Sequence, residues 1–181
     1  MLAQQARALG KFFADTRYTA IYTSDLKRAF GTALALYDAQ KDPKPTFDLS
    51  ELLREQHLGD AEGRPYGCNG GVNLEQAMMY PSLYSGDEKF PGGESMNELR
   101  QRARRAITTL LIRHVFQAAK EGKTIHVAVV SHGRCISQMI SDLLQMSTKQ
   151  TNTNNIVASR CCLLNTAWTR LVIDTEVRML R

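Results

Sequence analysis

The chain of 181 residues is 43% hydrophobic and 23% charged, the composition of an ordinary globular domain long enough for one buried core. It has no run of 18 apolar residues, and residues 1–13 lack the features of a secretion signal, so we expect a soluble cytoplasmic protein with no membrane partner. The net charge of +5 would suit nucleic acid, but the densest basic cluster, residues 100–105, lies within a helical pattern and predicts a solvated helix face.

The first elements alternate between helix and strand. Residues 2–13 carry apolar side chains at helical spacing, and residues 18–24 are rich in β-branched and aromatic residues typical of a strand. A second helix over residues 25–39 follows at once, and Ser24 or Asp25 is expected to be its N-cap.

The middle of the chain contains more turn residues. After a break with two prolines, residues 46–53 predict a short extended segment, and residues 64–93 are irregular apart from one short helix. Ser95, followed three residues later by Glu98, predicts a capping box ahead of a long amphipathic helix.

The last third returns to the alternating pattern. Residues 124–131 form a nearly continuous apolar run, which is typical of a strand covered on both faces. Residues 134–146 predict a helix, and residues 160–174 predict two strands joined near Asn165. Strands that alternate with helices predict one layered α/β domain over residues 1–181.

Two strand ends carry groups suited to an anion. Arg28 falls in the first turn of a helix, where its guanidinium can bind a phosphate or carboxylate bidentately. His132 follows the apolar strand, Gly133 allows close backbone approach, and a bound anion would raise the pKa of the imidazole. Glu55, if held protonated, could act as general acid. Each residue alone would more often be a surface ion pair or a turn residue.

Other motifs narrow the function classes. The sequence has no Gly-rich phosphate loop, GxGxxG or GxSxG, which removes the usual support for nucleotide kinases, Rossmann enzymes and serine hydrolases. The four cysteines lack Cys-X-X-Cys spacing, so we expect reduced thiols and no metal. His114 and His126 fall within a predicted helix and strand and are assigned to structure.

Taken in order, six stretches of the chain resemble elements of the histidine phosphatase superfamily, also called phosphoglycerate mutase-like. They are LAQQARALGKFF (2–13), SDLKRAFGTA (24–33), REQHLGDAEG (54–63), FPGGESMNELRQRARRAI (90–107), VVSHGR (129–134) and LLNTAWTRLVID (163–174). The resemblance implies a three-layer fold with a mostly parallel sheet flanked by helices, and a phosphomonoesterase that needs neither metal nor cofactor. In this mechanism a histidine attacks phosphorus and water hydrolyses the phosphohistidine.

Residue roles follow from the resemblance by position. Arg28 would hold the phosphoryl oxygens, His132 would stabilise their charge, and Glu55 would protonate the leaving oxygen.

The substrate side is implied in the same way. His57, Gly133 and Arg134 would border the substrate, and residues 64–93 would form an insert beside it. The short insert favours a phosphatase acting on small phosphorylated metabolites, with a phosphoglycerate mutase as the alternative within the family.

The nucleophile of the family lies in an Arg-His-Gly motif at the end of its first, central strand, and this chain has no such motif. His114 follows an arginine but precedes Val115, and His57 is the less unsuitable replacement. The chain is therefore expected to be N-terminally incomplete, to lack the central strand and to be inactive as given. Loss of that strand would leave two neighbours without ladder partners. A pseudoenzyme that binds phosphorylated ligands or a protein is the alternative from another class.

Overall fold

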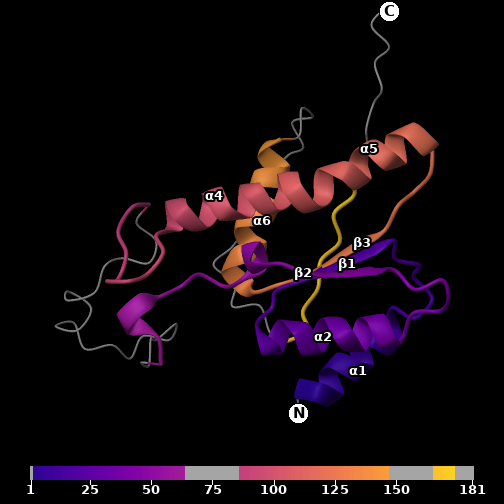
Figure 1. Ribbon diagram of the computed structural model, residues 1–181, viewed down its shortest axis with the longest axis horizontal. Coiled ribbons are helices and arrows are strands. Elements are labelled where there is room, and N and C mark those ends of the chain that lie inside the picture. The colour runs from indigo at the N-terminus through magenta and orange to yellow at the C-terminus, as the bar shows by residue number, and fades with distance from the viewer. Residues whose placement is uncertain (1, 64–85, 147–164, 174–181) are drawn as a thin grey trace, which may run out of the picture.

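The computed structural model describes residues 2–63, 86–146 and 165–173 and shows one parallel sheet between two layers of helices (Figure 1). The expected three-layer α/β fold is confirmed. The strands, in the order β2-β1-β3, are β1 (Ala20–Thr23), β2 (Thr46–Leu49) and β3 (Val127–Val130). The helices are α1 (Leu2–Phe12), α2 (Lys27–Asp38), α4 (Met96–Ala106), α5 (Ile112–Glu121) and α6 (Gly133–Gln145), with short turns η1 (Glu51–Leu53), η2 (Gly59–Ala61) and η3 (Ile107–Leu111).

The central strand β1 supplies both halves of the core, because successive side chains of a strand point to opposite faces. Ile21 packs with Ala33 and Leu36 of α2 on one face. Tyr22 packs on the other face with Leu99 of α4 and with residues of α6. The alternate residues of β3 contact these same two clusters, so both of its faces are covered, as its apolar run predicts.

The three strands pair without interruption. Ala20 of β1 is in register with Thr46 of β2 on one side and with Val127 of β3 on the other, and each pairing runs for four residues. The expectation that two neighbouring strands would lack ladder partners is wrong for the strands described here. The reason is that β1 and β3 lie side by side and satisfy each other's backbone groups.

The long helix begins with the predicted capping box. The Ser95 hydroxyl accepts a hydrogen bond from the Glu98 amide at 3.1 Å, and the Glu98 carboxylate accepts one from the Ser95 amide at 2.8 Å. The helix continues through the π-helical turn η3 into α5 and ends at Gly122, whose φ of 62° favours glycine. Among the described residues, none of the helices has the length and apolar character needed to cross a bilayer.

The predicted N-cap of α2 is wrong. Leu26 occupies the cap position without a side-chain hydrogen bond. The Ser24 hydroxyl instead accepts from the Leu26 amide at 3.2 Å, in the turn before the helix. The helix thus begins two residues later than its polar sequence suggests.

The predicted closing pair of strands is also not found in residues 165–173, which contain a turn and irregular backbone. These residues are largely exposed, and Trp168 contacts the rings of Phe12 and Phe13 instead of joining the sheet. The remainder of that prediction, and the short helix expected near residues 73–80, lie outside the described residues.

Candidate active site

Two segments distant in sequence meet at one edge of the sheet. Because β1 and β3 are parallel neighbours, their carboxyl ends lie together, and α2 and α6 begin at that edge. Arg28 lies in the first turn of α2, and His132 is the N-cap of α6. The Nε of Arg28 donates a hydrogen bond to Nδ1 of His132 at 2.9 Å, across 104 positions of sequence.

The imidazole of His132 has one engaged and one unpartnered nitrogen. The residue is 6% exposed, and its buried Nε2 has no hydrogen-bond partner within residues 2–63, 86–146 and 165–173. Since Nδ1 accepts from Arg28, a neutral ring must carry its proton on Nε2. The site therefore holds a buried N–H donor beside a guanidinium, which is the chemistry that recognises an oxyanion.

Burial lowers the pKa of His132, and the positive charge of Arg28 lowers it further, while the carboxylate of Glu55 acts in the opposite direction. The ring is therefore neutral at pH 7 in the protein without an anion. The raised pKa expected from the sequence applies to a ring that has an anion beside it, so the pKa of His132 should rise on anion binding.

This geometry predicts the tautomer of His132. In a 15N-labelled chain at pH 7, long-range 1H–15N spectra are expected to show His132 as the neutral Nε2–H form. Replacing Arg28 by alanine removes the donor to Nδ1, so the variant is expected to mix the two tautomers. An Nδ1–H or imidazolium pattern for His132 in the unaltered chain would contradict this assignment.

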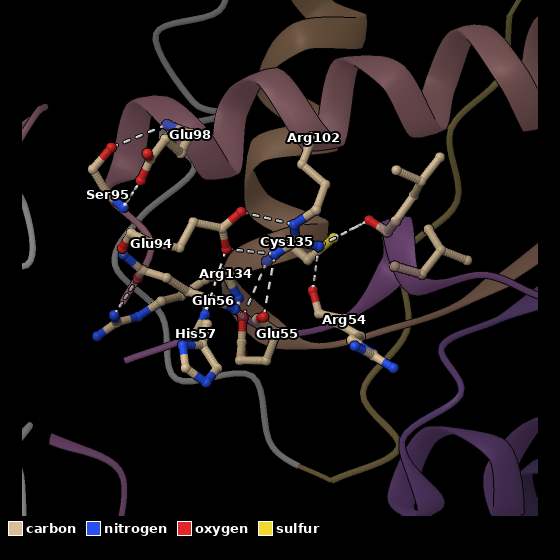
Figure 2. Close-up of polar contacts among 12 residues, drawn as sticks. Arg54, Glu55, Gln56, His57, Glu94, Ser95, Glu98, Arg102, Arg134 and Cys135 are labelled. Atoms are coloured by element: carbon tan, nitrogen blue, oxygen red, sulfur yellow. Dashed lines mark hydrogen bonds and ion pairs between the residues drawn. The ribbon is translucent and has the colours of Figure 1, made fainter. Parts of the chain in front are cut away.

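Glu55 directs its carboxylate at the start of α6 (Figure 2). Its Oε1 accepts from the amides of Gln56 at 3.0 Å and Cys135 at 3.3 Å, and its Oε2 accepts from the amide of Arg134 at 3.3 Å. These donors include free N–H groups of the helix N-terminus, where negative charge is stabilised. The carboxyl group thus lies at the helix turn that follows His132.

Two of the residues expected to border the substrate belong to the same turn. A Cβ added at Gly133 would lie 4.0 Å from Oε2 of Glu55, an ordinary contact distance, so steric closeness alone does not require glycine. Nη1 of Arg134 donates to the side-chain oxygen of Gln56 at 2.5 Å, and both residues lie near Glu55 in Figure 2.

Two other histidines make contacts away from this pair. His57 has a side chain 63% exposed, with Nδ1 2.9 Å from the Gly92 carbonyl oxygen and Nε2 3.7 Å from the Glu62 carboxylate. His57 is thus on the exposed side of the loop that follows Glu55. His114 lies against Tyr22, whose hydroxyl is 2.8 Å from its Nε2, in keeping with a structural assignment.

An ion pair that the sequence did not reveal joins Arg54, which precedes Glu55, to Asp25, which follows β1. Nε of Arg54 donates to Oδ1 of Asp25 at 2.8 Å, and its guanidinium also contacts Oδ2 and the Glu51 carboxylate. The hydrogen bond from Arg54 holds the pKa of Asp25 below its usual range. The turn that carries Glu55 is thereby tied to the end of β1.

The interpretation of the basic cluster 100–105 as a solvated face is wrong for one of its four arginines. The side chain of Arg102 is 18% exposed and lies 2.7 Å from the Glu94 carboxylate. Its position three residues after Leu99, which is fully buried, was the available signal, because residues i and i+3 share a helix face.

Comparison with known proteins agrees with the geometry. The family model described as histidine phosphatase superfamily (branch 1) matches residues 3–178. The fructose-2,6-bisphosphatase TIGAR of Xenopus tropicalis is 36% identical over 104 residues, covering 56% of this chain and 35% of that protein. The metal-independent phosphoserine phosphatase of Arabidopsis thaliana is 32% identical over 146 residues, covering 79% of this chain and 55% of that one.

Solved structures show the same fold. A mycobacterial glucosyl-3-phosphoglycerate phosphatase in complex with inorganic phosphate superposes with a TM-score of 0.62 at 24% identity, covering 80% of this chain and 68% of that chain. The chain spans only about a third to a little over half the length of these two curated relatives, 35% and 55% respectively.

Proposed function

Because the chain belongs to the histidine phosphatase superfamily, we propose that its site cleaves phosphate monoesters of small metabolites. The single observation that carries this proposal is the pair formed by Arg28 and His132. A guanidinium hydrogen-bonded to Nδ1 leaves the buried Nε2 of the ring as a donor with no partner among the residues that the structure describes. Glu55 lies beside this pair at the first turn of α6.

In the proposed reaction, Arg28 holds the phosphoryl oxygens and Nε2 of His132 donates to the charge that develops on them. A histidine nucleophile forms a P–N bond as the ester P–O bond breaks, and Glu55, which takes up a proton when the anionic substrate lies beside it, gives that proton to the leaving oxygen. Glu55 then takes a proton from water, which attacks phosphorus, breaks the P–N bond and releases phosphate.

We propose that the nucleophile is not among the histidines of this chain. The sequence has four, and none lies in an Arg-His-Gly motif. His132 is already engaged by Arg28 through Nδ1, and His114 is bonded to Tyr22. His57 is exposed and contacts the Gly92 carbonyl oxygen and the Glu62 carboxylate.

The 181-residue chain is accordingly expected to release no phosphate from phosphoserine, fructose 2,6-bisphosphate or a chromogenic aryl phosphate above the rate of the buffer. Phosphate release is measured for the unaltered chain and for the Arg28→Ala variant, which serves as a site-dead control. Turnover that disappears in the variant would show that this site is active with the residues of the chain alone and would contradict the proposal.

The substrate class rests on the relatives, which are named for phosphorylated sugars, phosphoserine and a phosphoglycerate derivative. We further propose that the protein is cytoplasmic and has no nucleic-acid partner. The basic stretch of α4 supports the second point, because Arg102 pairs with Glu94 and Arg104 lies 3.4 Å from the Asp142 carboxylate. Two of the four arginines of that stretch thus pair with carboxylates of the fold itself.

A second candidate function is the binding of phosphorylated ligands without turnover. The observation that favours it is the anion-binding pair in a chain without the expected nucleophile. Both candidates bind phosphate through Arg28 and His132, and only the enzyme needs the proton of Glu55. A Glu55→Gln variant is therefore expected to retain phosphate affinity under either candidate. Absence of turnover in the protein isolated from its natural source, with phosphate binding intact, would select this alternative.

A further inference from the structure

The guanidinium of Arg102, whose side chain is largely shielded from water, uses all of its N–H donors. Nε and Nη2 donate to the two oxygens of Glu94 at 2.8 and 2.7 Å. Nη1 donates to the carbonyl oxygens of Leu52 and Arg54 at 2.9 and 2.8 Å, and Nη2 donates to that of Glu55 at 3.2 Å. An arginine has five N–H donors, so all five are engaged (Figure 2).

The three carbonyl oxygens that accept from Arg102 lie in one short turn, residues 52–55. This turn places the carboxyl group of Glu55. The same turn is held from α6 and the segment before it. The Ser131 hydroxyl donates to the Leu53 carbonyl oxygen at 2.6 Å, and the Cys135 thiol donates to that of Leu52 at 3.8 Å. Arg102 thus holds the turn from α4 while Ser131 holds it from the end of β3.

Glu94 connects Arg102 to Gln56 and His57, the residues that follow Glu55. Its carbonyl oxygen accepts from the side-chain amide of Gln56 at 2.9 Å, and its backbone amide donates to the His57 carbonyl oxygen at 2.7 Å. With side chains 18% and 15% exposed, Arg102 and Glu94 form a pair largely shielded from water. Such a pair is costly to break, because either partner alone would be a buried charge.

We propose that Arg102 is a positioning residue for Glu55. Its planar guanidinium fixes the turn 52–55 so that the Glu55 carboxylate meets the amides of Arg134 and Cys135 beside His132. This role rests on the proposed function, in which Glu55 transfers the proton. Lysine cannot replace it, since an ammonium has three donors and no planar fork for a bidentate carboxylate.

The test compares Arg102→Lys with the unaltered chain by NMR. The amides of Arg134 and Cys135 report the Glu55 contact directly, and the side-chain carboxyl resonance of 13C-labelled Glu55 reports the environment of the group. In the variant we expect both amides to exchange with solvent about tenfold faster or more, and the Glu55 resonance to shift. Arg105→Lys, at an exposed position of the same helix, is expected to change neither.

Thermal unfolding of each variant verifies that it is folded, and the amides of β1 serve as the internal reference. If Arg102→Lys does not fold, Glu94→Gln is measured in its place, because it removes charge from the same pair with little change in volume. Unchanged exchange at Arg134 and Cys135 in a folded variant would overturn the proposal.

Phosphate affinity is measured on the same samples and separates this inference from the proposed function. Among the described residues, no hydrogen bond joins Arg28 or His132 to Arg102 or Glu94, and lysine keeps the positive charge that Arg102 places near His132. The folded Arg102→Lys chain is therefore expected to keep its phosphate affinity within about twofold. Absence of phosphate binding by the unaltered chain would refute the proposed function, while the exchange data would still decide whether Arg102 positions Glu55.

Discussion

An Arg28→Ala variant is expected to bind inorganic phosphate about 10- to 100-fold more weakly than the unaltered chain, because a hydrogen bond to a charged group contributes roughly 1.5–3 kcal/mol. The guanidinium is hydrogen-bonded to His132 and lies in the first turn of α2, where the free N–H groups of the helix also favour an anion. Titration calorimetry at fixed ionic strength measures the two dissociation constants.

Lys27→Ala is the matched control for that variant. Lys27 is the neighbour of Arg28 in the same turn and is also exposed, so its loss removes the same charge without the contact to His132. Its effect is expected to be small and to fade with added salt, since exposed charges are screened. Equal weakening in the two variants would reduce the role of Arg28 to general electrostatic attraction.

A Leu99→Ala variant is expected to lose about 2–5 kcal/mol of unfolding free energy, the usual cost of truncating a buried leucine. Leu99 is 0% exposed and lies in the core cluster that joins α4, α6 and the Tyr22 face of the sheet. Because removal of the side chain leaves a cavity between packed helices, the loss includes both transfer and cavity contributions. Urea unfolding followed by circular dichroism measures it.

Leu34→Ala gives the comparison, because Leu34 also lies in a helix but is 40% exposed. Its substitution is expected to change the unfolding free energy by no more than about 0.5 kcal/mol. If Leu99→Ala were as mild as Leu34→Ala, the packing of α4 against the sheet described above would be incorrect.

The features that were predictable from sequence depend on neighbours in the chain. The capping box of Ser95 and Glu98 involves residues three apart, and it is present as expected. The strands around residues 20–23 and 127–130 follow from short apolar runs, and the parallel sheet follows from their alternation with helices. The placement of Arg28 and His132 at strand ends is local as well, and parallel pairing brings them together.

The features that were not predictable depend on distant partners. Arg102 donates to carbonyl groups 47 to 50 positions away in sequence. Its basic neighbours predicted a solvated side chain, whereas its partners shield it from water. Residues 165–173 have the composition of strands, but a strand needs an edge to pair with, and there Trp168 contacts the aromatic rings of α1 and the residue that follows it. The direct pairing of β1 with β3 likewise follows from which strands lie adjacent, which no local pattern encodes.

The measurement that tests the central claim most directly is a calorimetric titration of the folded 181-residue chain with inorganic phosphate, followed by competition with phosphoserine. The arrangement of Arg28 and His132 predicts saturable one-to-one binding, displaced by the ester and weakened by Arg28→Ala. A folded chain that binds neither phosphate nor the ester would contradict the assignment of this edge of the sheet as a phosphoryl site.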